Sequence, residues 1–302
     1  MIPLEEEIRQ LKKEKNAVIL AHYYVPDCVQ AIADEVGDSF YLAKKAKDSK
    51  ASLIVFAGVS FMGESACMLN PDKKVCMPDL TADCAMAHMA SEEKIKHMRD
   101  MYDDLAVVCY INSTAALKML SDVCVTSSNA VGIVRALPNQ HIYFIPDGNL
   151  GAFVKAQVPE KDIILNDGFC PVHQQMTIQD VTAAKAEHPG AQLLVHPECP
   201  AEVADAADFV GSTAEIIEFA GKSEAESFII GTEDGVLHEL NKRNPNKHFY
   251  PLKKMQQCAD MKKVTLEKVR DCHKYEGGQI TVPSDVCRLA VKPLEKMLEM
   301  AK

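Results

Sequence analysis

The sequence has 302 residues, of which 47% are hydrophobic and 25% are charged, enough apolar material for the packed cores of two or three domains. The formal net charge of −10 argues against nucleic-acid binding, because a phosphate backbone requires a basic surface. No apolar run approaches the roughly 18 residues that cross a bilayer, and the acidic start Met1–Glu7 lacks the apolar stretch of a signal peptide. We therefore expect a cytoplasmic protein that does not bind membranes.

Short apolar runs alternate along the chain with amphipathic stretches. Stretches such as Glu92–Asp104 and Thr177–Glu187 predict helices. The alternation of strand and helix predicts parallel sheets covered by helices on both faces. The predicted strands are Ala17–Tyr24, Ser52–Gly58, Lys74–Met77, Leu105–Ile111, Val123–Thr126, His141–Ile145, Asp162–Leu165, Gln192–His196, Asp208–Val210, Ser227–Ile230 and His248–Tyr250.

These strands fall into three sets that resemble one another. The first strand of each set ends in a polar triplet, namely His22-Tyr23-Tyr24, Tyr110-Ile111-Asn112 and His196-Pro197-Glu198. The second ends in a small-residue turn, namely Gly58-Val59-Ser60, Ser127-Ser128-Asn129 and Gly211-Ser212-Thr213. The third ends near an aspartate at Asp79, Asp147 or Asp234. The pattern predicts three α/β units of similar length, although any α/β chain can produce some such matches.

Cysteines close the three sets. The chain holds 11 cysteines, none in a Cys-x-x-Cys pair, which argues against zinc-finger spacings and against a disulfide framework in a reducing compartment. Most are therefore expected to be buried thiols. Cys84 and Cys170 are 86 residues apart, and Cys170 and Cys258 are 88 apart, so these three follow the period of the repeat.

The repeat predicts a shared site. Ligands of open parallel sheets bind beyond the carboxyl ends of the strands. If the three units pack around a pseudo-threefold axis with those ends inward, the triplets and turns face one central cavity and the three cysteines meet at its floor. Three thiolates on an iron–sulfur cubane leave one iron without a protein ligand, and such an iron can act as a Lewis acid.

Motifs along nearly the whole chain resemble the quinolinate synthase family, because they occur together and in this order. They are Ala21-His22-Tyr23-Tyr24, Thr81-Ala82-Asp83-Cys84, Tyr110-Ile111-Asn112-Ser113, Thr126-Ser127-Ser128-Asn129-Ala130, Pro146-Asp147-Gly148-Asn149-Leu150-Gly151, Cys170-Pro171-Val172-His173, His196-Pro197-Glu198-Cys199, Gly211-Ser212-Thr213 and Cys258-Ala259-Asp260-Met261-Lys262.

The resemblance implies three similar α/β/α domains around a central [4Fe–4S] cluster and active site, with one cysteine ligand from each domain: Cys84, Cys170 and Cys258. It places the units at residues 1–88, 89–174 and 175–272, with a helical tail, 273–302, packing on the body. The implied reaction condenses iminoaspartate with dihydroxyacetone phosphate to quinolinate, with loss of phosphate and two waters, in de novo NAD biosynthesis. An L-aspartate oxidase or an aspartate dehydrogenase could supply the iminoaspartate.

The resemblance also implies which residues act. Glu198 is our first choice for the base, and Tyr24 and Tyr110 are candidate proton donors or acceptors. His196 is the fourth candidate catalytic residue. The implied substrate-binding residues are His22, Ser39, Tyr110, Asn112, Ser127, His173, His196, Glu198 and Thr213. Each has a simpler interpretation, because a histidine at a strand end is usually just hydrogen-bonded and a serine there often caps a helix.

Other functions stay open at this point. Another [4Fe–4S] hydro-lyase would share the three cysteines but not the motifs, and a non-catalytic α/β protein could bind small anions. No GxGxxG follows a strand and no Walker loop is present, which argues against a nicotinamide dehydrogenase and a nucleotide hydrolase. At the carboxyl end, Pro283-Ser284 predicts the start of a helix, and Pro293 is predicted to divide the tail into two segments.

Overall fold

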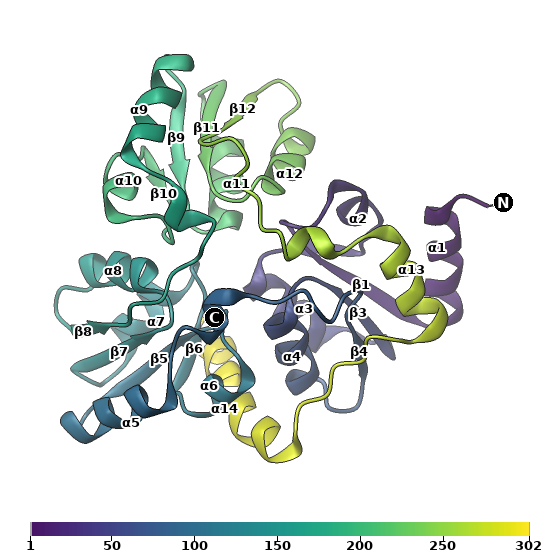
Figure 1. Cartoon of the computed structure of the whole chain (residues 1–302), viewed down its shortest axis with the longest axis horizontal. Helices are drawn as coiled ribbons and strands as arrows, with labels where there is room; N and C mark the ends of the chain where they lie inside the picture. The colour runs from purple at the N-terminus through teal and green to yellow at the C-terminus, as the bar shows by residue number, and fades with distance from the viewer. Residues whose placement is uncertain (1, 302) are drawn as a thin grey trace.

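The computed structural model describes residues 2–301, which form three separate lobes around a common centre (Figure 1). Each lobe contains one four-stranded parallel sheet with helices on its faces. The predicted fold class, three similar α/β/α units, is thereby confirmed. The predicted boundaries of the units, at residues 88, 174 and 272, stay predictions, although each sheet draws its strands from one of those ranges.

The three sheets share one topology, because their strand orders are β2-β1-β3-β4, β6-β5-β7-β8 and β10-β9-β11-β12. The central strands β3 and β5 are buried at every position, as expected for parallel sheets covered on both faces. The strands are β1 (Ala17–His22), β2 (Glu35–Gly37), β3 (Leu53–Ala57), β4 (Lys74–Cys76), β5 (Ala106–Tyr110), β6 (Val123–Val125), β7 (His141–Ile145), β8 (Asp162–Leu165), β9 (Gln192–Val195), β10 (Phe209–Val210), β11 (Ser227–Gly231) and β12 (His248–Pro251).

Helices follow most strands and cover the sheets. Helix α5 begins at Glu92 and α9 at Ile178, both close to the predicted starts. The helices are α1 (Leu4–Glu14), α2 (Asp27–Ile32), α3 (Ser39–Asp48), α4 (Ser60–Leu69), α5 (Glu92–Met101), α6 (Ala115–Met119), α7 (Ala130–Ala136), α8 (Gly148–Gln157), α9 (Ile178–Glu187), α10 (Ala201–Asp205), α11 (Thr213–Lys222), α12 (Val236–Arg243), α13 (Leu266–Tyr275) and α14 (Ser284–Met300). None of the helices between residues 2 and 301 is both long and apolar enough to cross a membrane.

The prediction missed β2, and this error shifted the comparison of the three units. Strand β2 has only three residues, Glu35-Val36-Gly37, and lies at the edge of its sheet, so it carries no apolar run. Once β2 is included, it corresponds to β6 and β10, whereas the predicted strand 52–58 corresponds to β7 and β11. The predicted match of Gly58-Val59-Ser60 with Ser127 and Thr213 was therefore wrong. The residue that occupies their position in the first unit is Ser39.

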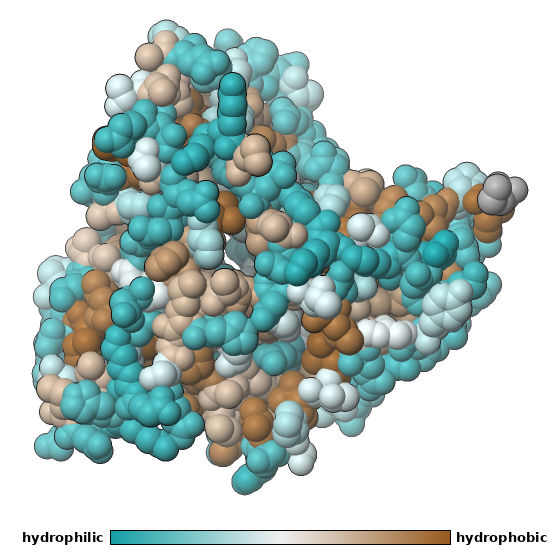
Figure 2. All heavy atoms as spheres, viewed as in Figure 1, coloured by the Kyte–Doolittle hydropathy of each residue, from teal (hydrophilic) through white to brown (hydrophobic). Residues whose placement is uncertain are grey.

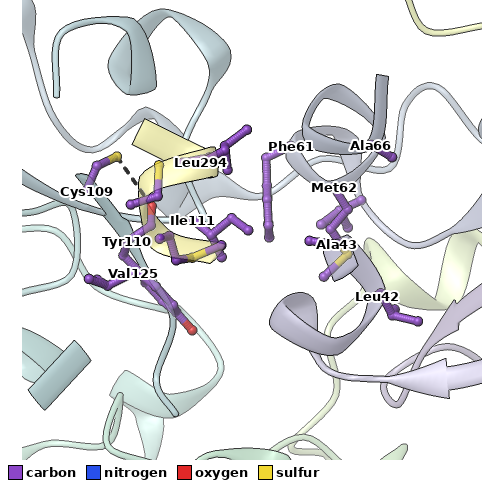
Figure 3. Close-up of a cluster of buried hydrophobic side chains, with 14 of the residues drawn as sticks. Leu42, Ala43, Phe61, Met62, Ala66, Cys109, Tyr110, Ile111, Val125 and Leu294 are labelled. Carbon is purple, nitrogen blue, oxygen red and sulfur yellow. Dashed lines mark hydrogen bonds between the residues drawn. The ribbon is translucent and has the colours of Figure 1, made fainter. Parts of the chain in front are cut away.

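The tail helix α14 begins after Pro283, as predicted, but Pro293 does not divide it. Pro293 is buried, and Ala290, Leu294 and Met297 are buried on the same helix, which packs against α6, β6 and α4. This burial outweighs the backbone hydrogen bond that a proline removes inside a helix. Figure 3 shows Leu294 facing Ile111 and Phe61, so the tail helix completes the apolar core between the first and second units.

The surface is mostly polar on the face shown in Figure 2, with scattered apolar residues. The same view is hollowed near its centre, where the three lobes meet. The carboxyl ends of strands from all three sheets approach this centre, because the segments that follow β1, β5 and β9 line one cavity there.

Candidate active site

One cavity at the centre of the molecule is lined by residues from all three units, and its empty volume is about 690 Å³ with the mouth included. Every site residue predicted from the sequence lines it. They are His22, Tyr24, Ser39, Cys84, Tyr110, Asn112, Ser127, Cys170, His173, His196, Glu198, Thr213 and Cys258. The structure thus brings these thirteen residues together, while the role of each stays a prediction.

The three cysteines reach the cavity by equivalent routes. Cys84, Cys170 and Cys258 each follow the fourth strand of their unit, and each is followed within three residues by a single 3-10 turn. None of the three forms a disulfide. Burial, followed by the negative charges of Glu198 and Cys258, raises the pKa of Cys84 to about 12. Burial, Glu198 and Cys84 likewise raise the pKa of Cys170.

These thiols fit a metal centre. Each resists ionisation because it is buried near other anions, so a bound cation would relieve the repulsion and favour the thiolates. The donor atoms of Cys170, His173 and Glu198 also lie within 4.8 Å of one another. His173 Nε2 and Glu198 Oε1 are already hydrogen-bonded to the hydroxyls of Thr232 and Tyr110, whereas the three sulfurs come from equivalent positions of the three units and are the better ligand set. Three soft sulfur donors suit an iron–sulfur cluster.

His22 and His196 are held alike in the first and third units. The Nδ1 atom of His22 accepts a hydrogen bond from the backbone N–H of Tyr24 at 3.2 Å, and that of His196 accepts one from Glu198 N–H at 3.3 Å. Because Nδ1 is an acceptor, the neutral ring carries its proton on Nε2. Burial lowers the pKa of both histidines to about 3, so both are neutral near pH 7.

Glu198 is a buried carboxylate with one hydrogen-bond donor and a histidine ring beside it. The Tyr110 hydroxyl donates to its Oε1 at 2.6 Å, and His173 Nδ1 lies 2.9 Å from its Oε2, off the direction of a linear hydrogen bond. Burial opposes ionisation. At the acid pH where Glu198 titrates, however, His196 is protonated too, and its charge, that of His173 and the Tyr110 hydroxyl outweigh burial and lower the pKa of Glu198 to about 2. Glu198 is therefore ionised in the resting cavity.

A chain of hydrogen bonds joins two parts of the cavity lining, which we call the Glu198 wall (Glu198 and His173) and the Tyr24 wall (Tyr24 and Thr213). His173 Nε2 lies 2.9 Å from Thr232 Oγ1, which lies 2.8 Å from the hydroxyl of Tyr24. The Tyr24 hydroxyl also lies 2.6 Å from Thr213 Oγ1. Burial raises the pKa of Tyr24 well above its usual value, so this phenol is protonated. The sequence interpretation missed Thr232, which is fully buried and belongs to none of the motifs. Its place directly after β11 was the available signal.

Glu233 and Lys262 were missed as well. Glu233 lines the cavity, and its Oε1 accepts from the backbone N–H of Cys258 and from Lys262 Nζ, both at 2.9 Å. Lys262 also donates to the carbonyl oxygen of Tyr24 at 2.7 Å. This pair fixes the third cysteine against the first unit.

The hydroxyls of Ser39 and Thr213 are not used as helix caps. Asp38 caps α3 and Ser212 caps α11, while Ser39 and Thr213 are the first helical residues and line the cavity. Asn129 precedes α7, which leaves Ser127 in the cavity wall as well. The interpretation as a cap is thus confirmed for Ser212 of the Ser212-Thr213 pair, while Ser39 and Thr213 line the cavity.

A three-unit α/β/α scaffold whose units contribute matched thiols and buried ionisable groups to one cavity has the form of an enzyme active site. A family model described as quinolinate synthetase A protein matches residues 6–299. Proteins named quinolinate synthase are similar over nearly the full length: 53% identity with that of Caldicellulosiruptor saccharolyticus, covering 99% of this chain and 98% of the relative, and 50% with that of Fusobacterium nucleatum, covering 99% of each. The chain therefore belongs to the quinolinate synthetase A family of enzymes.

Proposed function

We propose that this enzyme condenses iminoaspartate with dihydroxyacetone phosphate to give quinolinate, phosphate and two waters, in de novo NAD biosynthesis. The observation that carries the proposal is the meeting of Cys84, Cys170 and Cys258 with Glu198, His173 and Tyr24 in one cavity. Behind its lining, Thr232 links His173 to Tyr24 by hydrogen bonds. The names of the full-length relatives support the same reaction.

The three cysteines would hold a [4Fe–4S] cluster, one from each unit. When bound, such a cluster supplies an iron with an open position that can act as a Lewis acid toward a substrate oxygen or nitrogen. Cys258 would be kept in place by Glu233, which binds its backbone N–H.

Neutral hydrogen-bond donors would bind the anionic substrates. Among residues 2–301, the lining of the cavity includes no arginine or lysine. The Nε2–H groups of His22 and His196 and the hydroxyls of Ser39, Ser127 and Thr213 are therefore the donors available to carboxylates and phosphate. The amino-terminal ends of α3 and α11, at Ser39 and Thr213, add partial positive charge at the same wall.

In proton transfer, the Glu198 wall would accept protons and the Tyr24 wall would donate them. Glu198 is ionised and can accept a proton, while Tyr24 is protonated and can donate one. The hydrogen bond from Tyr110 contributes to making Glu198 a weak base at rest. A substrate that displaces this donor would raise the pKa of Glu198 and make it a stronger base where the substrate lies.

The enzyme would depend on a partner reaction for iminoaspartate, because this imine hydrolyses in water. An L-aspartate oxidase or an aspartate dehydrogenase would supply it. The net charge of −10 supports partners other than nucleic acid.

The test is an anaerobic assay. The purified protein, with its iron and sulfide counted, is given both substrates, and quinolinate is measured by mass spectrometry. Omission of either substrate is the control. We expect quinolinate only when both are present. A protein with a full cluster that dehydrates a hydroxy acid without triose phosphate would support the hydro-lyase alternative, and one without iron or turnover would support the anion-binding alternative.

A further inference from the structure

Two cysteines outside the cavity face each other across neighbouring strands of the second unit. Cys109 on β5 and Cys124 on β6 are direct partners in the register of the sheet, and both are fully buried. Partners in a parallel ladder project from the same face, so the two thiols are neighbours across the β5–β6 pair. Both are buried, as the sequence analysis expected of most cysteines.

A buried lysine lies beside this pair. Lys118 on α6 is fully buried, its Nζ donates to the carbonyl oxygen of Ser113, and it lies 5.4 Å from the centre of the Phe61 ring. Within residues 2–301 no carboxylate forms an ion pair with it. Burial lowers the pKa of Lys118, and the ionisable groups that oppose this effect most strongly are the thiols of Cys124 and Cys109, ahead of Glu64. Since a buried ammonium is costly without an anion, the two thiols are its natural partners.

The surroundings favour a thiolate at Cys109. Burial opposes its ionisation, but the Cys124 thiol, the Ser113 hydroxyl and the Lys118 charge outweigh burial and lower the pKa of Cys109 to about 7. The Ser113 hydroxyl is buried without a hydrogen-bond partner in the resting structure, so it is available to a thiolate at Cys109. Cys199 offers a contrast within the same molecule, because it is equally buried, next to the site residue Glu198, and its pKa is raised by burial. A thiolate is the nucleophilic form of cysteine.

We propose that Cys109 and Cys124 form a redox-active dithiol that closes to a reversible disulfide when a peroxide reaches it. The Cys109 thiolate attacks one peroxide oxygen, the O–O bond breaks, and hydroxide leaves, which gives a sulfenic acid. Cys124 then attacks that sulfur and displaces a second hydroxide. Two protons from the thiols convert the two hydroxides to water, so one peroxide is reduced by two electrons as one disulfide forms.

The strand geometry allows the bond but strains it. Neighbouring strands lie about 4.7–4.9 Å apart, at the short end of the Cα separations of about 4.4–6.8 Å that disulfides span. A strained disulfide is readily reduced, which makes the closure reversible.

The dithiol is placed to affect the cavity. Cys109 immediately precedes Tyr110, and its Sγ lies 3.4 Å from the Tyr110 carbonyl oxygen (Figure 3). Strand β6 leads in the same way to Ser127, and both Tyr110 and Ser127 line the cavity. Joining β5 to β6 would therefore shift two of its walls. The chemistry of the dithiol itself does not rest on the proposed reaction.

Trypsin provides a direct test, because cleavage after Arg99, Lys118 and Arg135 places Cys109 in peptide 100–118 and Cys124 in peptide 119–135, each without another cysteine. The anaerobic holoenzyme is treated with increasing hydrogen peroxide, quenched with N-ethylmaleimide in denaturant, digested and analysed by mass spectrometry. We expect the linked pair of peptides at doses that leave Cys199 unoxidised and the visible absorbance of the cluster intact, and we expect dithiothreitol to remove the link.

Two results would overturn the proposal. One is recovery of both cysteines as maleimide adducts at doses that oxidise Cys199. The other is a link that forms only after the cluster absorbance has gone, because unfolding would then explain it. Neither outcome depends on whether the protein makes quinolinate.

Variants separate the parts of the site. Cys124→Ala should stop at the sulfenic acid of Cys109, which a 1,3-diketone reagent traps. Lys118→Met keeps the bulk of the side chain but removes the charge, so the rate of linking should fall roughly tenfold as the thiolate fraction falls. This change also removes the tryptic site after residue 118, so in this variant the link is measured within the single peptide 100–135, which carries no maleimide until it is reduced. If that variant does not fold, Ser113→Ala removes a donor to the thiolate and should slow linking in the same direction. Rates equal to wild type in a folded variant of either kind would contradict the assigned role of that residue.

Discussion

The first and third units contribute the same local structure to the cavity, but the residues that this structure places there have opposite proton-transfer properties. In both, a histidine lies at the carboxyl end of the strand, and its Nδ1 accepts a hydrogen bond from the backbone N–H of the residue two positions later. That later residue is Tyr24 in the first unit and Glu198 in the third. Burial keeps Tyr24 protonated, whereas the lowered pKa of Glu198 keeps that carboxylate ionised. The repeated fold thus supplies equivalent positions, and a single side chain at each decides whether the wall donates or accepts a proton.

The largest expected effect comes from Glu198→Gln. Glutamine keeps the shape and can still accept from Tyr110, but it cannot take up a proton. We expect an intact cluster, nearly normal substrate binding, and a kcat lower by on the order of a hundredfold or more. Steady-state kinetics with iron counted on the same sample checks this. A variant with a lower melting temperature but a normal rate would show that Glu198 is structural.

The matching change in the first unit is Tyr24→Phe. It removes the phenolic proton and the bonds to Thr213 and Thr232 but keeps the ring. We expect the cluster to be retained and the rate to fall by roughly tenfold to a hundredfold, with an intermediate accumulating. Rapid quench and mass spectrometry detect the intermediate. Turnover at the wild-type rate would leave the first wall without a role in proton transfer.

The connection between the walls is tested by Thr232→Val, which replaces the hydroxyl joining His173 to Tyr24 with a methyl group. We expect kcat to fall roughly tenfold with little change in KM, and the protein to lose about 1–3 kcal/mol of stability because buried partners are left unpaired. Thr182→Val on the exposed side of α9 is the control. An unchanged kcat would mean that the two walls act independently.

The smallest effect concerns pH. The pKa of His22 and His196 is about 3 in the folded protein, against an ordinary value of 6.5. The unfolded chain therefore binds more protons as the pH falls from 6.5 to 3, and stability drops across that window. Replacing either histidine with asparagine removes the loss of stability that this histidine causes at acid pH. The acid-unfolding midpoint of the metal-free protein should therefore fall by roughly half a pH unit or less. A midpoint that rises would contradict the pKa assignments.

The sequence allowed the three units and thirteen of the residues that line the cavity to be predicted, because the polar segments lie at strand ends and parallel strands bring those ends together. Strand β2 escaped because three residues carry no periodicity. The continuous helix through Pro293 depends on tertiary burial of Leu294 and Met297, which outweighs local preference. Thr232 and the Cys109–Cys124 pair required the side-chain contacts and the β5–β6 register, neither of which a residue pattern specifies.

The most direct test of the central claim, that three equivalent positions of a repeated fold hold one cluster, is a count of iron and sulfide in cysteine variants prepared anaerobically. Serine at Cys84, Cys170 or Cys258 should in each case abolish a stable [4Fe–4S] cluster, because each unit supplies one ligand. Cys67→Ser and Cys287→Ser, which change cysteines outside the cavity lining, should keep the full complement. Full iron and sulfide in all three variants of the cavity cysteines would contradict the account.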